Sequence, residues 1–140
     1  MREMFVLDCS VAAKWVLPEP NCAPALRLFD RYASGEISLI APDLLLAEFA
    51  SLLAKQTRRK LISAGQARKA FQLMTQCVPP LFDMRSRLSG ALRLALQHHM
   101  SLWDCVYLDL ALERNCSLLT ADRRLFRAGA ARHPAIQLVQ

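Results

Sequence analysis

The chain has 140 residues, a length suited to one domain, 1–140, with its own hydrophobic core. Hydrophobic residues make up 54% of it and only four are glycine, which excludes a disordered or collagen-like chain. Lysine and arginine outnumber aspartate and glutamate by 18 to 12, and the formal charge of +6 favours a polyanionic partner such as nucleic acid without requiring one.

The apolar runs and the cysteines indicate where in the cell the protein is expected. No apolar run approaches the roughly 20 residues that a bilayer-spanning helix needs, so no membrane association is expected. The cysteines are odd in number and show no zinc-binding spacing, so we expect reduced core residues in a cytoplasmic protein. They are Cys9, Cys22, Cys77, Cys105 and Cys116.

The first half of the chain alternates apolar runs with amphipathic segments. Residues 4–7 form an apolar run that predicts a buried parallel strand ending at Asp8. Ser10 is expected to cap the next helix and Pro18 to stop it, while Pro42 is expected to open a long helix at its first position. The elements predicted here are strands 4–7 and 37–40 and helices 11–17, 25–32 and 42 to about 60.

The second half continues the alternation. Ser63 is expected to cap a helix that ends before Pro79, and Ser101 opens another. The elements predicted here are helices 64–76, 88–97 and 101–114, a helical turn 122–127, and strands 81–82, 117–120 and 136–139. Strands that alternate with helices predict an α/β fold, in which helices cover both faces of a mainly parallel central sheet.

Most of the acidic residues are expected at the surface. Asp109 and Glu113 point away from Asp104 around their helix and should form a solvated stripe. Six others lie at chain ends, in turns or beside polar residues, where solvent exposure is the rule. They are Glu3, Glu19, Asp30, Glu36, Asp43 and Asp83.

Four further carboxylates stand where a solvated side chain is not expected. Asp8 and Asp122 each follow the tip of a predicted strand, Asp104 begins a helix, and Glu48 lies in a helix that is apolar nearly all round. Each also has a structural alternative, because the three aspartates fit helix caps and Lys55 is available to pair with Glu48.

All four carboxylates are able to converge above one edge of the sheet. Two carboxylates 4 Å apart repel by about 4 kcal/mol at an effective dielectric of 20, so such a cluster calls for a divalent cation. Oxygen ligands favour Mg²⁺ or Mn²⁺ over zinc. The sequence therefore predicts a hard-metal site built from distant segments.

Four segments, in this order along nearly the whole chain, resemble the PIN-domain ribonucleases, most closely the short VapC-type toxins of prokaryotic toxin–antitoxin pairs. The segments are 5–11 (FVLDCSV), 41–48 (APDLLLAE), 102–113 (LWDCVYLDLALE) and 118–125 (LLTADRRL). The most specific parts are Trp-Asp-x-x-Tyr at 103–107 and Thr-Ala-Asp at 120–122. Cys105 stands where the family more often has alanine, and a small apolar residue fits either way.

The resemblance implies a fold, a reaction and partners. The fold is the three-layer α/β/α sandwich of the PIN domain, and the activity is Mg²⁺- or Mn²⁺-dependent endoribonuclease cleavage by a toxin that inhibits translation. The partners are an RNA substrate, a cognate antitoxin and a second copy of the chain in a homodimer. The metal-binding, catalytic residues are Asp8, Glu48, Asp104 and Asp122, with Ser10 and Thr120 as supporting polar residues.

Basic residues near these acids are candidates for RNA contacts. Arg123, Arg124 and Arg127 follow Asp122 and are suited to hold flanking phosphates, unless they form an ordinary solvated helix face. Lys14 and Trp15 follow Asp8 by one to two helical turns and are able to approach the same groove.

Two other functions compete with RNA cleavage. A non-hydrolytic RNA-binding module would use the same basic rim and act by occupancy, although four intact acids argue against it. A phosphate-accepting receiver domain also clusters acids over an α/β sheet, but it needs an adjacent acidic pair, which this sequence lacks.

Overall fold

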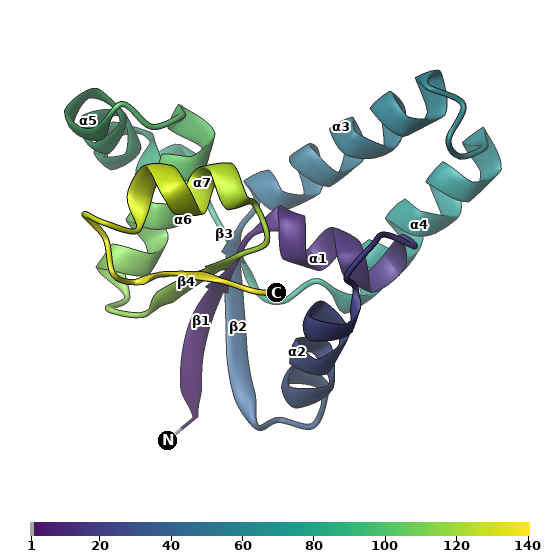
Figure 1. Cartoon of the computed structure of the whole chain (residues 1–140), viewed down its shortest axis with the longest axis horizontal. Helices are drawn as coiled ribbons and strands as arrows, with labels where there is room; N and C mark the ends of the chain where they lie inside the picture. The colour runs from purple at the N-terminus through teal and green to yellow at the C-terminus, as the bar shows by residue number, and fades with distance from the viewer. Residues whose placement is uncertain (1) are drawn as a thin grey trace.

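Five parallel strands form the centre of the protein, whose computed structural model describes residues 2–140 (Figure 1). The strand order is β3-β2-β1-β4-β5, and every neighbouring pair is parallel. The predicted parallel sheet is therefore confirmed. The strands are β1 (Glu3–Leu7), β2 (Ile37–Pro42), β3 (Leu81–Phe82), β4 (Ser117–Thr120) and β5 (Ile136–Leu138).

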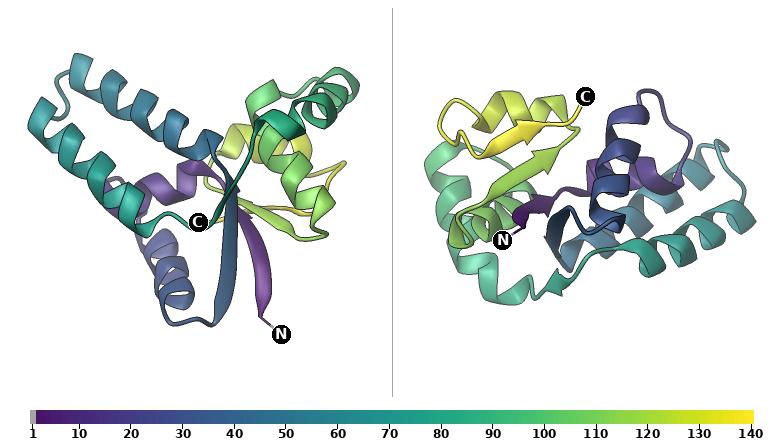
Figure 2. Two further views of the ribbon diagram at one scale, coloured as in Figure 1. Left: turned by 180° about the vertical axis from the view of Figure 1, so that it is seen from behind. Right: turned by 90° about the horizontal axis from the view of Figure 1, so that it is seen from below.

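Helices cover both sides of this sheet, as the alternation predicted. Helices α1 to α4 lie on one side, and α6, with α5 packed against it, lies on the other (Figure 2). The helices are α1 (Cys9–Val16), α2 (Ala23–Ala33), α3 (Leu44–Arg58), α4 (Ala64–Cys77), α5 (Leu88–His98), α6 (Leu102–Glu113) and α7 (Arg123–Gly129), with a 3₁₀ turn at Arg85–Arg87. None of the helices within residues 2–140 combines the length and apolarity needed to cross a bilayer.

Helix α6 is the central element of the core. It packs on β1, β2 and β4, and buried side chains lie on nearly all of its circumference, from Cys105 to Ala111. A helix that is apolar all round is stable only when neighbours surround it. Because α6 is held in this way, the residues of its first turn occupy a well-defined place at the edge of the sheet.

Helices α3 and α4 form an antiparallel hairpin that projects from the sheet (Figure 1). Ser63 caps α4 as predicted, since its Oγ accepts from the Gln66 backbone N–H at 3.0 Å while the Gln66 side chain accepts from the Ser63 N–H at 2.8 Å. This reciprocal capping box satisfies two backbone donors and ends the connecting turn.

The predicted start of the long helix at Pro42 is wrong. Pro42 is the last residue of β2, and α3 begins two residues later at Leu44. The backbone N–H groups of Ala41 and Asp43 donate to Pro80 and Phe82, which extends the ladder between β2 and β3 past the proline. Because alternate residues donate to β3, the missing N–H of Pro42 costs no bond to that strand.

The predicted cap at Ser10 is also wrong. Helix α1 begins at Cys9 with Asp8 in the extended N-cap position, so Ser10 lies inside the first turn. The Ser10 hydroxyl donates to the Asp8 carboxylate at 2.5 Å instead of capping the backbone.

The expected solvated stripe on α6 is wrong for Asp109. The 3₁₀ turn brings Arg87, which is buried, against α6, where its guanidinium pairs with Glu113 and lies 3.5 Å from Asp109 Oδ2. Asp109 is therefore partly buried beside a cation, whereas Glu113 stays exposed. The helical periodicity of α6 could not predict this contact, because Arg87 comes from a separate 3₁₀ turn after Pro79 and Pro80.

Candidate active site

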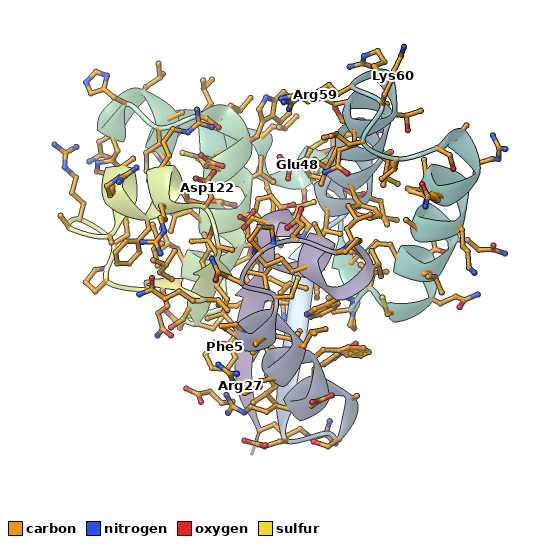
Figure 3. The ribbon with its side chains drawn as sticks, turned by 45° about the vertical axis from the view of Figure 1, so that its right-hand side comes forward. Phe5, Arg27, Glu48, Arg59, Lys60 and Asp122 are labelled. Carbon is orange, nitrogen blue, oxygen red and sulfur yellow. The ribbon has the colours of Figure 1, made fainter. Side chains whose placement is uncertain are left out.

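The carboxyl ends of β1 and β4 border a pocket of about 370 Å³. Asp8 follows β1, Asp122 follows β4, Asp104 lies in the first turn of α6 and Glu48 lies on α3. Figure 3 labels Glu48 on α3 and Asp122 at the start of α7. All four predicted acids line this one pocket, which brings together segments up to 114 residues apart in the chain.

Asp8 is the buried member of the group. Its Oδ2 accepts from Ser10 Oγ at 2.5 Å and from Thr120 Oγ1 at 2.8 Å. Burial raises the pKa of this carboxyl, while the two hydroxyls act in the opposite direction by stabilising the ionised form. The same hydroxyls accept from the backbone N–H groups of Ala121 and Asp122, so they tie the end of β1 to the loop after β4.

Glu48 meets a hydroxyl in place of the lysine considered above. Tyr107, fully buried on α6, donates to Glu48 Oε1 at 2.7 Å, and no ion pair with Lys55 forms among residues 2–140. Burial, reinforced by repulsion from Asp8 and Asp104, raises the pKa of Glu48 to about 7 despite the tyrosine. Sequence reasoning missed Tyr107, although a tyrosine in an apolar helix signals a buried hydroxyl that needs a partner.

Asp104 and Asp122 both stand at helix starts, as their structural alternatives predicted. Ser101 Oγ accepts from the Asp104 N–H at 3.1 Å, and Asp122 Oδ1 accepts from the N–H groups of Arg124 and Leu125. Burial raises the pKa of Asp104 to about 6, with added repulsion from Asp8 and Asp122. Capping and pocket lining are therefore compatible, because the cap of Asp122 uses a single carboxylate oxygen.

The acidic pocket also contains Glu19, which was expected at the surface. Glu19 lines the pocket and lies 3.5 Å from Lys14 Nζ, which donates to the carbonyl of Pro20 as well. Lys14 thus reaches the pocket as predicted. Trp15 does not line the pocket, because its ring packs against α2 and its Nε1 donates to the carbonyl of Ala25.

The three arginines after Asp122 differ in surroundings. Arg124 is near enough to Asp104 to lower its pKa, against the stronger effect of burial. Arg123 lines a neighbouring cavity of about 390 Å³ together with Lys14. Arg127 lies in the last turn of α7, is exposed and lines neither cavity.

The donor chemistry of the pocket fits a hard divalent cation. Its candidate ligand atoms are carboxylate oxygens. Burial raises the pKa values of Glu48 and Asp104, and the mutual repulsion that adds to this effect would be relieved by positive charge. Within residues 2–140 no three His, Cys, Asp or Glu side chains stand in a ready-made metal-binding group. The pocket therefore suits a hard divalent cation through the type and charge of the side chains that line it.

Comparisons with known proteins give consistent results. The PIN domain family model matches residues 5–131. Ribonuclease VapC3 of Pyrobaculum aerophilum is 30% identical over 134 residues, covering 94% of this chain and 96% of that protein. Ribonuclease VapC9 of Mycobacterium tuberculosis is also 30% identical over 134 residues, covering 94% of this chain and 95% of that protein.

Solved structures share the fold at lower identity. PAE2754 from Pyrobaculum aerophilum superposes with a TM-score of 0.73 at 18% identity, covering 98% of this chain and 84% of that one. VapC20 of Mycobacterium tuberculosis, described as a sarcin–ricin loop cleaving toxin, gives 0.67 at 18% identity, with 89% and 95% covered. VapBC2 from Rickettsia felis, bound to a promoter DNA fragment, gives 0.66 at 16% identity, with 96% of each chain covered.

Proposed function

The chain belongs to the PIN-domain family, and we propose that it is a metal-dependent endoribonuclease acting as the toxin of a type II toxin–antitoxin pair. The observation that carries the proposal is the pocket in which carboxylates from four separate elements meet. Such a concentration of negative charge, in a chain of net charge +6, suits a cation-assisted reaction on a polyanion.

Asp8, Glu48, Asp104 and Asp122 are proposed to hold Mg²⁺ or Mn²⁺. A bound divalent ion supplies Lewis acidity, lowering the pKa of a water and neutralising charge at the phosphodiester. The chain's own task is to present ionised oxygens in place. The hydroxyls of Ser10 and Thr120 hold the Asp8 carboxylate in place by hydrogen bonds. Tyr107 donates a hydrogen bond to Glu48, and Asp122 is held by the backbone N–H groups that it caps.

Substrate phosphates need cations beside the acidic pocket. Arg123, Arg124 and Arg127 are proposed for this role, because α7 begins directly after Asp122. Single-stranded or looped RNA is the favoured substrate, since an unstacked backbone is able to enter a narrow cleft. An enzyme that cleaves cellular RNA acts in the cytoplasm, which is the location this proposal implies.

The proposal includes two protein partners, an antitoxin and a second copy of the chain. The antitoxin is supported by related folds that were solved in toxin–antitoxin complexes, among them VapBC2 and a complex from Klebsiella pneumoniae. Leu92 and Leu96 on α5 are 51% and 72% exposed, which provides apolar surface for a protein contact.

The test is cleavage of RNA by purified protein on a denaturing gel, with Mg²⁺ and with EDTA. Asp8→Asn keeps the side-chain volume but removes the charge, so we expect cleavage to fall by about 100-fold or more while the circular dichroism spectrum stays unchanged. Asp30→Asn, at an exposed position on α2, is the matched control and should cleave normally.

Two results would contradict the proposal. Cleavage by Asp8→Asn at the wild-type rate would remove Asp8 from the metal site. RNA binding without cleavage, insensitive to EDTA, would favour the occupancy mechanism of a non-hydrolytic binding module.

A further inference from the structure

A slot on α3 adjoins the acidic pocket. Leu44, Ala47 and Ser51 line one wall of a cavity of about 330 Å³, and Trp103 of α6 lines the other. Glu48 belongs to both this cavity and the acidic pocket. On α3, Ala47 and Glu48 are neighbours and each lies three or four positions from Leu44 and from Ser51, so the four residues form a single stripe along the helix.

Trp103 is a large aromatic side chain left half exposed beside the site. It is 50% exposed and directly precedes Asp104, and its side chain makes no hydrogen bond or ring–ring contact within residues 2–140. Trp15, by contrast, stacks on Tyr32 and hydrogen-bonds to the backbone. The exposed residue Ala47 lines the same cavity from α3, and its small side chain leaves open space beside the tryptophan.

A cavity of opposite character adjoins the acidic pocket elsewhere. Lys14 and Ala121 line both the acidic pocket and this second cavity, which Arg123 lines as well. The second cavity shares no lining residue with the Trp103 slot. The acidic pocket thus connects an aromatic slot without any cation to a cavity with two cationic side chains.

We propose, resting on the ribonuclease function above, that the Trp103 slot stacks one unpaired nucleobase of the RNA next to the phosphate being cleaved. The slot lacks a cation and therefore suits a base, whereas Lys14 and Arg123 suit the neighbouring backbone phosphate. Every base has a π-face, so stacking tolerates all four and favours the larger purines. Bases inside a duplex are already stacked, so the slot selects single-stranded RNA.

Binding of a labelled 12-nucleotide single-stranded RNA tests the slot, with Asp8→Asn added to every variant to stop cleavage. Trp103→Leu should weaken binding by about 5- to 150-fold, while Trp103→Phe should retain most of the affinity. The loss should be larger for oligoadenylate than for oligouridylate. Leu73→Ala removes a leucine that is 42% exposed on α4 and lines neither the slot nor the acidic pocket, so it should leave binding unchanged.

Salt dependence separates stacking from phosphate contacts. Trp103→Leu should leave the slope of log affinity against log salt unchanged, whereas Arg123→Gln should reduce its magnitude by about 0.7 per lost single-strand phosphate contact. Arg2→Gln is the charge control, because Arg2 precedes β1 and lies at the opposite end of that strand from Asp8.

Fluorescence reports the stacking directly. Trp15→Phe leaves Trp103 as the sole tryptophan, since the chain has two, and addition of the 12-nucleotide RNA should quench its emission. Unchanged affinity in Trp103→Leu, or unquenched emission, would overturn the slot while wild-type cleavage leaves the ribonuclease standing.

Two further outcomes overturn the slot in other ways. If the wild-type protein neither binds nor cleaves RNA, the proposed function fails and the slot fails with it. If Trp103→Leu instead changes the oligomeric state in light scattering and cleaves normally, a second copy of the chain covers Trp103.

Discussion

The hydrogen bond from Tyr107 to Glu48 holds one carboxylate of the acidic pocket in place. Tyr107 is fully buried, and its hydroxyl lies 2.7 Å from Glu48 Oε1. Tyr107→Phe keeps the ring that packs in the core and removes only the donor. The substitution therefore tests the orientation of a carboxylate proposed to bind the metal, without changing the charge of the pocket.

The expected magnitude follows from the kind of bond. A hydrogen bond to a charged acceptor contributes about 1.5–3 kcal/mol, and loss of a partner that orients a metal ligand reduces metal affinity or activity by about 10- to 100-fold. We therefore expect the cleavage rate to be about 10- to 100-fold lower. The free energy of unfolding should fall by about 1–2 kcal/mol, because Glu48 loses a donor but is only partly buried, and phenylalanine leaves no hydroxyl unsatisfied in the core.

The assay is single-turnover cleavage of the 12-nucleotide RNA over a series of Mg²⁺ concentrations. Since the lost bond orients a proposed cation ligand, higher Mg²⁺ should recover part of the activity of Tyr107→Phe. Tyr32→Phe, on α2 and outside the pocket, is the matched control. A Tyr107→Phe protein that matches the wild type in rate and in Mg²⁺ dependence would refute the reasoning.

Three further predictions concern stability, each measured by urea unfolding. In EDTA, the raised pKa values of Asp104, about 6, and Glu48, about 7, mean that the folded state holds extra protons above about pH 4. The unfolding free energy should therefore fall as the pH rises from about 4 to about 7, by about 1–2 kcal/mol per group after allowance for partial exposure. A flat profile would contradict this, and Mg²⁺ above pH 7 should restore stability. Arg87→Met should lower the free energy of unfolding by about 2 kcal/mol, because Asp109 would lose the cation beside it while keeping some contact with water. An unchanged unfolding midpoint would argue against a stabilising Arg87–Asp109 ion pair. Thr120→Val should lower the free energy of unfolding by about 1–3 kcal/mol, because Asp8 loses a hydrogen-bond donor and the Asp122 N–H loses its acceptor. Thr120→Ser keeps the hydroxyl and should therefore retain most of the wild-type stability.

The sequence alone was sufficient for the order of elements and for four of the five acids that line the pocket, with Glu19 as the exception. Local spacing encodes both, because apolar runs such as 4–7 predict buried strands, and an aspartate directly after such a strand lies at the carboxyl edge of a parallel sheet. Asp8 and Asp122 were predictable for this reason. Pro42 was misplaced because proline suits a helix start and a strand end equally well, and only the pairing with β3 decides between them.

The tertiary structure alone decided which side chains meet. The partners Tyr107 and Glu48 are 59 positions apart, and Arg87 and Glu113 are 26 apart, so no local periodicity links them. A helical pattern states which face of an element is buried, but the side chain that arrives from another element depends on how the layers pack. The same packing brought Glu19 into the acidic pocket and left Trp103 open beside it.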